Sequence, residues 1–172
     1  AYAIRAMASA GLEFLVASSY SKNFSYYAER CGALSVVHKD KTAADSTLGK
    51  LNAWIRKNYS NPPIHGGAAI ALVLNDAELF QSWVADVSAM RTRIHAMRQA
   101  VHQHLASHAP HYDADYMIKQ QGVFSYTGLS LEQILRLREE FGVYMLDSGR
   151  ISLPGLTSQN VEYYAKSIAA VV

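Results

Sequence analysis

A long stripe of apolar residues in the middle of the chain constrains its fold more than any other feature. Within residues 78–105, apolar side chains recur at spacings of three and four, the period of one face of an α-helix. They are Phe80, Val84, Val87, Met90, Ile94, Met97, Val101 and Leu105. At 1.5 Å per residue, such a helix is about 40 Å long, more than a small domain requires. We therefore predict that it connects two lobes, residues 1–85 and 86–172.

The segments before this helix alternate between strand and helix patterns. Residues 13–17 and 34–37 are short runs of β-prone residues, and we interpret them as two buried strands that flank a polar loop. Helices are predicted over residues 43–57 and 65–74.

The segments after the long helix alternate in the same way. Strands are predicted over residues 122–126, 142–145 and 150–153. Between the first two lies a helix that opens with the capping-box sequence Ser130-Leu131-Glu132-Gln133. An amphipathic helix over residues 161–172 ends the chain. The sequence therefore predicts an α/β fold class with a small α/β unit at its C-terminal end.

Composition narrows the class of protein. Half of the 172 residues are apolar, 17% are charged and the formal net charge is +2, as in an ordinary globular protein. Basic residues form no cluster that would indicate a nucleic-acid partner. The single cysteine, Cys31, favours the cytoplasm, or an organelle matrix such as that of mitochondria, over secretion. No apolar run approaches the roughly 20 residues that span a bilayer, so we expect no membrane partner.

A polar loop after the first predicted strand carries the residues with most chemical potential. Ser19 and Ser21 lie just before Lys22, and Arg30 lies eight residues after it. An amine and a phosphate-sized anion could both be held there. Burial and a neighbouring cation lower the pKa of a lysine in such a setting, which makes its neutral amine available to attack an aldehyde. Two alternatives remain from the residues alone. The lysine is simply solvated, or the loop is an anion site for a nucleic acid or another phosphate ligand, which the near-neutral charge disfavours.

Three sequence blocks carry a resemblance to a known family. Residues 17–33 read Ala-Ser-Ser-Tyr-Ser-Lys-Asn-Phe-x-x-Tyr-x-Glu-Arg-x-Gly-Ala, which is similar to the cofactor-lysine motif of the aspartate/aromatic aminotransferase family. Residues 55–66 and 148–156 match two further blocks of the family, and residues 119–129 and 135–144 also look like family sequence. The resemblance therefore covers nearly the whole chain.

The resemblance implies a fold and a cofactor. The fold is that of the fold-type-I transferases that depend on pyridoxal 5'-phosphate. Residues 1–85 would be the C-terminal part of the cofactor-binding large domain, and residues 86–172 the small C-terminal α/β domain. Lys22 would carry the cofactor as a Schiff base and later act as the general acid/base. Ser19 and Arg30 would hold the cofactor phosphate.

The resemblance also implies how a substrate is held. Arg150 would clamp the α-carboxylate with its planar fork. Arg56 would bind the distal carboxylate of aspartate or glutamate in the active site of the neighbouring subunit, which implies a homodimer. Asn58 and Ser60 would support that pocket, and Phe124 would pack near the substrate.

The implied activity is transamination between an L-amino acid and a 2-oxo acid in ping-pong order. Arg56 favours aspartate and glutamate without excluding aromatic amino acids. The family's Asp that pairs with the cofactor's pyridine nitrogen has no match before Lys22, where Glu13 is the only acid. We therefore expect the chain to be part of a longer polypeptide and inactive alone. The alternative is a non-catalytic fragment that acts as a structural or dimerisation lobe.

Two smaller features of the sequence complete the hypothesis. The chain has Ser25 where the family commonly has Gly, and this change touches no residue with an implied role. His104 and His108 are four residues apart on the long helix, a spacing that suits a metal ion. No acidic or cysteine third ligand is apparent, so we expect a solvated helix face and no metal.

Overall fold

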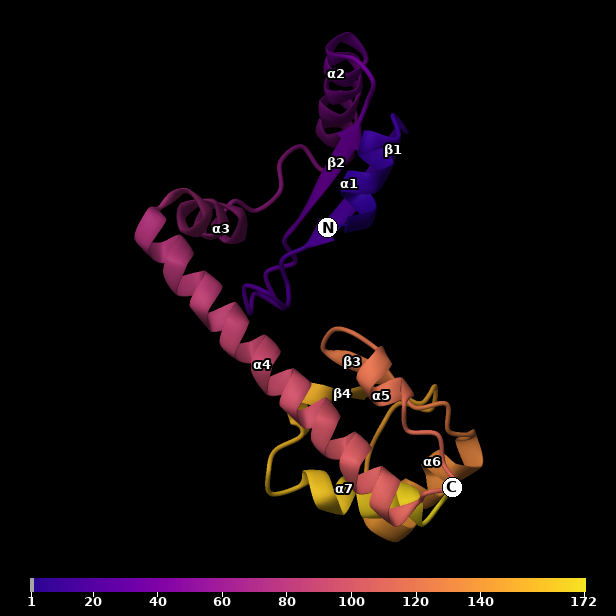
Figure 1. The fold of residues 1–172 in the computed structure, drawn as a ribbon. Coiled ribbons are helices and arrows are strands. Elements are labelled where there is room, and N and C mark those ends of the chain that lie inside the picture. Colours follow the sequence, from indigo (N-terminus) through magenta and orange to yellow (C-terminus); the bar gives the residue numbers. More distant parts are fainter. Residues whose placement is uncertain (1) are drawn as a thin grey trace. The chain divides into compact units, whose positions relative to one another are not determined.

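A computed structural model describes residues 2–172, and the chain divides into two compact units, Ala1–Ala85 and Asp86–Val172 (Figure 1). We call them the N-terminal unit and the C-terminal unit. The helix predicted over residues 78–105 is confirmed as α4 (Ala77–His108), 32 residues long, and the division falls within it.

The N-terminal unit is built on one antiparallel hairpin. Strands β1 (Phe14–Ser19) and β2 (Gly32–Val37) pair from Phe14↔Val37 to Ser19↔Gly32, which confirms the two predicted strand positions. Helices α2 (Lys41–Asn58) and α3 (His65–Asn75) confirm the two predicted helices. Helix α1 (Tyr2–Ser9) had no counterpart among the predicted elements.

The expectation that both strands are buried is wrong for this chain. Leu15 of β1 is 69% exposed and Leu34 of β2 is 54% exposed. Helix α2 packs beside β2 (Figure 1), but among residues 2–172 no third strand pairs with either one. The apolar residues of both strands predict burial, but the described residues include no further strands or helices that cover their exposed faces.

Side-chain contacts join the hairpin to α2. Asp40 caps the helix by accepting a 2.8 Å hydrogen bond from the backbone N–H of Ala43. Just before it, the His38 ring lies 3.0 Å from Glu13 Oε1 and 2.8 Å from Thr47 Oγ1, so one imidazole links the start of β1 to α2. These bonds fix how α2 leaves the sheet.

The C-terminal unit packs helices around a second antiparallel pair. Strands β3 (Phe124–Tyr126) and β4 (Arg150–Ser152) pair from Phe124↔Ser152 to Tyr126↔Arg150. The other elements are α5 (Tyr116–Lys119), α6 (Leu131–Phe141), the 3₁₀ turn η1 (Leu153–Gly155) and α7 (Val161–Ala169). The predicted strands at 122–126 and 150–153 and the two predicted helices are confirmed.

One hydrophobic core holds this unit together. Fully buried aliphatic residues come from α4, α6, η1 and α7: Val101, Leu105, Ile134, Leu137, Leu153 and Ile168. The apolar stripe of α4 is buried only towards its C-terminal end, since Val84 and Met90 are each 40% exposed. The predicted capping box of α6 is confirmed, with Ser130 and Gln133 bonded reciprocally.

The strand predicted over residues 142–145 is wrong. Gly142 ends α6 in the left-handed conformation at φ 62°, and the following residues join no ladder. Val143 and Met145 pack against the core, whereas Tyr144 is 78% exposed. The run therefore alternates in burial as a strand does, but it lacks the partner strand.

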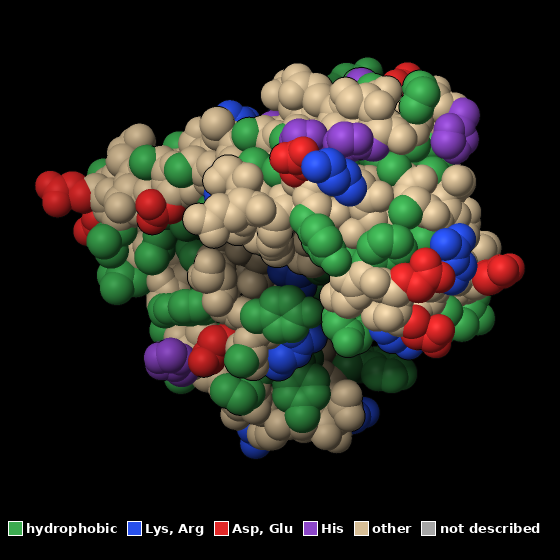
Figure 2. All heavy atoms as spheres, turned by 90° about the horizontal axis from the view of Figure 1, so that it is seen from below, with side chains coloured by type: hydrophobic (Ala, Val, Ile, Leu, Met, Phe, Trp, Pro, Cys, Tyr) green, Lys and Arg blue, Asp and Glu red, His purple; other side chains and the backbone are tan. Residues whose placement is uncertain are grey.

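The surface mixes apolar and charged side chains (Figure 2). In the described residues, no helix is both long enough and apolar enough to cross a membrane.

Candidate functional site

The loop between β1 and β2 carries three of the predicted site residues. Ser19 is the last residue of β1, Lys22 lies within the loop and Arg30 stands just before β2. The backbone N–H of Tyr20 donates to the carbonyl of Cys31 at 3.1 Å and closes the loop. Ser19 and Lys22 are exposed, as is Arg30. The turn thus places a hydroxyl, an amine and a guanidinium on one short segment.

Tyr27 contacts both basic residues of this loop. Lys22 Nζ lies 3.8 Å from the centroid of the Tyr27 ring, a cation–π contact. Arg30 Nη1 donates a 2.9 Å hydrogen bond to the Tyr27 carbonyl. Arg30 itself has φ 55°, a left-handed conformation that is uncommon outside glycine. Tyr27 could not be singled out from the sequence, because exposed tyrosines are common.

Hydroxyl contacts order the start of the loop. Ser19 Oγ donates to Ser21 Oγ at 3.1 Å and accepts from the Ser21 backbone N–H at 3.3 Å. Ser21 is buried, whereas Ser19 and Lys22 are exposed. The buried Ser21 side chain therefore fixes the backbone next to Lys22.

Aromatic packing within the N-terminal unit fixes the part of the loop that follows Lys22. The Phe24 ring stacks on Trp83 with centroids 4.8 Å apart, and the Trp83 indole N–H donates to the Asn23 carbonyl at 2.7 Å. Ser25 has φ 55°, so the position where the family commonly has Gly is one where the backbone favours Gly. The loop is therefore fixed at several points around the lysine.

The predicted substrate residues of the N-terminal unit gather at the end of α2. Asn58 is the last residue of the helix, and Arg56 lies half a turn before it. Arg56 Nη1 donates to Ser60 Oγ at 3.5 Å, a long hydrogen bond, and Ser60 has φ 64°. All three side chains are exposed, so the guanidinium is available to a ligand.

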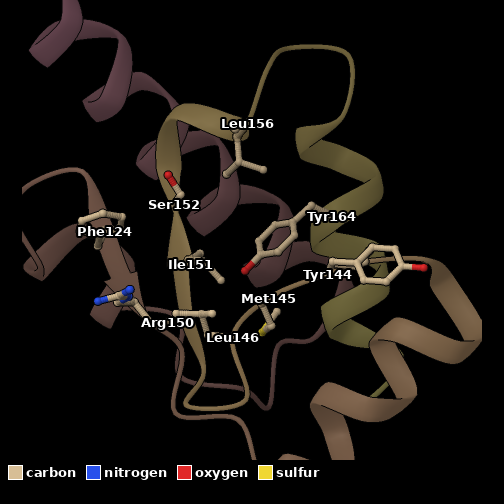
Figure 3. Close-up of a pocket in the computed structure, with 11 residues that line it drawn as sticks. Phe124, Tyr144, Met145, Leu146, Arg150, Ile151, Ser152, Leu156 and Tyr164 are labelled. Atoms are coloured by element: carbon tan, nitrogen blue, oxygen red, sulfur yellow. The ribbon is translucent and has the colours of Figure 1, made fainter. Parts of the chain in front are cut away.

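Arg150 and Phe124 meet in the C-terminal unit because β3 and β4 pair. The Arg150 guanidinium carbon lies 4.9 Å from the centroid of the Phe124 ring. Both residues line a pocket of about 570 Å³, and Figure 3 shows them side by side at one end of it. The aromatic face supports the planar guanidinium from one side and leaves its donor edge for an anion.

Tyr164 also lines this pocket, although the sequence indicated only a core position on the last helix. Its ring points inward in Figure 3, and its hydroxyl is buried with no hydrogen-bond partner in the described chain. Burial raises the pKa of this phenol, so the group stays neutral.

Arg98 of α4 supports the strand that carries Phe124. The side chain is 2% exposed, and its donors reach the carbonyls of Met117, Gly122 and Phe124, each at 2.9 Å. It also reaches Ser125 Oγ at 3.2 Å, and burial lowers its pKa. Arg98 lies four residues after Ile94 and three before Val101, so its place on the apolar stripe was readable in the sequence.

Comparison with known proteins places the chain in a family. Residues 1–168 match the family described as Aminotransferase class I and II. Over 172 residues the chain is 54% identical to the aromatic-amino-acid aminotransferase of Escherichia coli K12, covering 100% of this chain and 43% of that protein. It is also 44% identical over 169 residues to the aspartate aminotransferase of the same organism, covering 98% of this chain and 43% of the relative.

Solved structures agree with this assignment. An aromatic-amino-acid aminotransferase from Burkholderia pseudomallei, described as covalently bound to pyridoxal phosphate, superposes with a TM-score of 0.93 at 46% identity. The match covers 99% of this chain and 43% of that one. The chain thus spans less than half the length of the relatives that it matches. With almost every residue inside the family match, the chain belongs to the class I and II aminotransferases.

Proposed function

We propose that the protein is an aminotransferase that moves an amino group between an L-amino acid and a 2-oxo acid with pyridoxal 5'-phosphate as cofactor. The loop between β1 and β2 carries this proposal, because it holds Ser19, Lys22 and Arg30 on one segment of a chain that belongs to the family. The N-terminal unit is then the C-terminal part of the cofactor-binding large domain. The C-terminal unit is the small domain.

The donors of this loop fit the cofactor. Its aldehyde requires a primary amine, which Lys22 supplies, and its phosphate requires hydrogen-bond donors and positive charge. Arg30 offers a guanidinium and Ser19 a hydroxyl, and both side chains are exposed. When bound, the cofactor withdraws electrons from the substrate's α-carbon and so makes its proton removable.

Lys22 has two roles in this proposal. Its amine would hold the cofactor covalently, and once the amine is freed, Nζ would move the proton between the substrate's α-carbon and the cofactor. The contact with the Tyr27 ring holds Nζ at one place in the loop. A general acid/base must be positioned before its pKa matters, and this contact contributes to that positioning.

Arg150 binds the α-carboxylate of the substrate. A guanidinium makes two parallel hydrogen bonds to a carboxylate, which fixes the substrate's orientation as well as its position. The Phe124 ring lies beside that guanidinium, with its centroid 4.9 Å from Arg150 Cζ, and supports its position. Tyr164 lines the same pocket.

Arg56 binds the second carboxylate of aspartate or glutamate, with Asn58 and Ser60 supporting it. In the proposal this group comes from the neighbouring subunit, so the active form is a homodimer. We propose that aromatic amino acids are substrates as well, because the chain is 54% identical to an aromatic-amino-acid aminotransferase. The single cysteine supports a reducing compartment, and we place the enzyme in the cytoplasm.

The test uses the natural full-length protein loaded with pyridoxal phosphate. Aspartate and tyrosine are each assayed as amino donors with 2-oxoglutarate, and the cofactor linkage is reduced with borohydride and mapped by mass spectrometry. We expect turnover with both donors and a pyridoxyl label on Lys22. Lys22→Ala should lower kcat by at least about 100-fold, the range of a lost general base.

Lys50→Ala is the matched control, because Lys50 is an exposed lysine on α2. It should retain both the label and the activity. A label on a different lysine, or full activity in Lys22→Ala, would contradict the proposal. Absence of turnover in the folded, cofactor-loaded full-length protein would also contradict it, whereas turnover by the chain of 172 residues alone would refute the alternative of a structural or dimerisation lobe.

A further inference from the structure

Three potential metal ligands meet on the surface of the C-terminal unit. His104 and His108 lie one turn apart on α4, with parallel rings whose centroids are 6.3 Å apart and whose planes differ by 4°. Glu162, in the first turn of α7, lies beside them. One ligand atom from each of the three residues falls within 4.8 Å of the other two. The sequence alone showed no third ligand, because α7 is distant along the chain.

The helices that carry these residues are held by the core. Val101 and Leu105 of α4 are fully buried, as are Ala165 and Ile168 of α7. Ligands on packed helices are positioned more accurately than ligands on loops. The three side chains themselves are exposed or half-buried, so they retain freedom to rotate.

The distances are compatible with coordination after a small rotation of side chains. Zinc bonds to histidine nitrogen at about 2.1 Å, so two ligand atoms of a tetrahedral site are about 3.4 Å apart. The three ligand atoms lie within 4.8 Å of one another, so they must approach by about 1.4 Å at most. Two histidines and one carboxylate leave a further position for water, as in known zinc sites of this composition.

The position of Glu162 suits a metal ion. Its Oε1 lies 2.8 Å from Lys166 Nζ, an ion pair within one turn of α7. The carboxylate has a second oxygen with lone pairs, so an ion can bind beside the lysine. Lys166 nevertheless repels a cation and competes with it for Glu162. Near the top of Figure 2, histidine side chains lie next to an acidic and a basic one.

We propose that His104, His108 and Glu162 bind a divalent ion of the late first transition row, with zinc as the physiological candidate. Imidazole ligands select zinc, nickel and copper over magnesium and calcium, which prefer oxygen. The bound ion links α4 to α7, the last helix of the chain, so it stabilises the C-terminal unit. It takes no part in transamination.

The test measures zinc binding to the tag-free full-length protein by calorimetry and by competition with a fluorescent zinc chelator. We expect His108→Ala and Glu162→Gln, which lie on different helices, each to weaken binding by at least about tenfold. Lys166→Met should strengthen it by removing the competing cation. Zinc should also raise the midpoint of thermal unfolding of the wild type, and this rise should disappear in His108→Ala.

The control is His95→Ala, an exposed histidine on the same helix, and it should bind zinc within twofold of the wild type. Circular dichroism establishes that each variant is folded. Equal zinc affinity in the wild type, His108→Ala and Glu162→Gln would overturn the proposal, because any zinc bound would then lie elsewhere. So would magnesium binding as tight as that of zinc.

Discussion

At the scale of single residues, Arg98 is the clearest case of one side chain that determines the shape of a site. Its guanidinium donates to three backbone carbonyls and one hydroxyl while being 2% exposed. A buried carbonyl that loses its donor costs about 1–3 kcal/mol, and several would lose theirs together. We therefore predict that Arg98→Met lowers the free energy of unfolding by about 3 kcal/mol or more, measured by chemical denaturation.

Arg91→Met is the matched control, since Arg91 is exposed on the same helix and should change stability by less than about 0.5 kcal/mol. Arg98→Lys is a second probe, because an ammonium cannot reproduce the fork that reaches several acceptors. It should also destabilise the protein. A stability of Arg98→Lys equal to that of the wild type would show that charge alone, without the fork, is sufficient.

Residue chemistry also shows what the sequence could and could not predict about the candidate site. The motif of residues 17–33 placed Ser19, Lys22 and Arg30 on one loop because they are close in sequence, and the hairpin contains them as expected. Tyr27, Tyr164 and Glu162 were missed because their contacts come from folding. Tyr164 lies on the apolar face of an amphipathic helix, so the sequence indicates a core position, and only the structure shows that the residue lines a pocket.

At the scale of elements, local signals predicted the helices well. The capping box at Ser130 predicted the start of α6, whereas its end at Gly142 emerged only from the structure. The run 142–145 failed as a strand because alternation reports which side chains are buried and says nothing about hydrogen-bond partners. Helix α1 and the four-residue α5 were missed because short helices carry little periodic signal.

The capping box at the start of α6 should contribute measurably to stability. Ser130 Oγ accepts from the Gln133 backbone N–H at 3.2 Å, and the Gln133 side chain accepts from the Ser130 N–H at 2.9 Å. Ser130→Ala removes the first of these bonds and should lower the free energy of unfolding by about 1 kcal/mol. The comparison is Ser107→Ala: this exposed serine bonds the Gln103 carbonyl within α4, and its loss should cost less than about 0.5 kcal/mol. Equal effects of the two substitutions in chemical denaturation would contradict a specific role for the cap.

At the scale of the whole molecule, the two units differ in how much of their apolar surface they bury. The C-terminal unit has a contiguous core drawn from α4, α6 and α7. In the N-terminal unit, Trp54 is 75% exposed and Ile64 is 80% exposed, and both strands of the hairpin show apolar side chains to solvent. An isolated two-stranded sheet is at best marginally stable in water. The units should therefore differ in stability when the chain of 172 residues is studied alone.

Hydrogen exchange measures this difference directly. In the chain of 172 residues, we predict that backbone amides of β1 and β2 exchange at least about tenfold faster than those of α6 and α7, because local opening of the hairpin exposes little further apolar surface. In the natural full-length protein the hairpin should become strongly protected, while α6 and α7 change little. Equal protection of the hairpin and the two helices in the short chain would show that the N-terminal unit is stable without further layers. Weak protection of α6 and α7 in both proteins would instead contradict the role assigned to the C-terminal core.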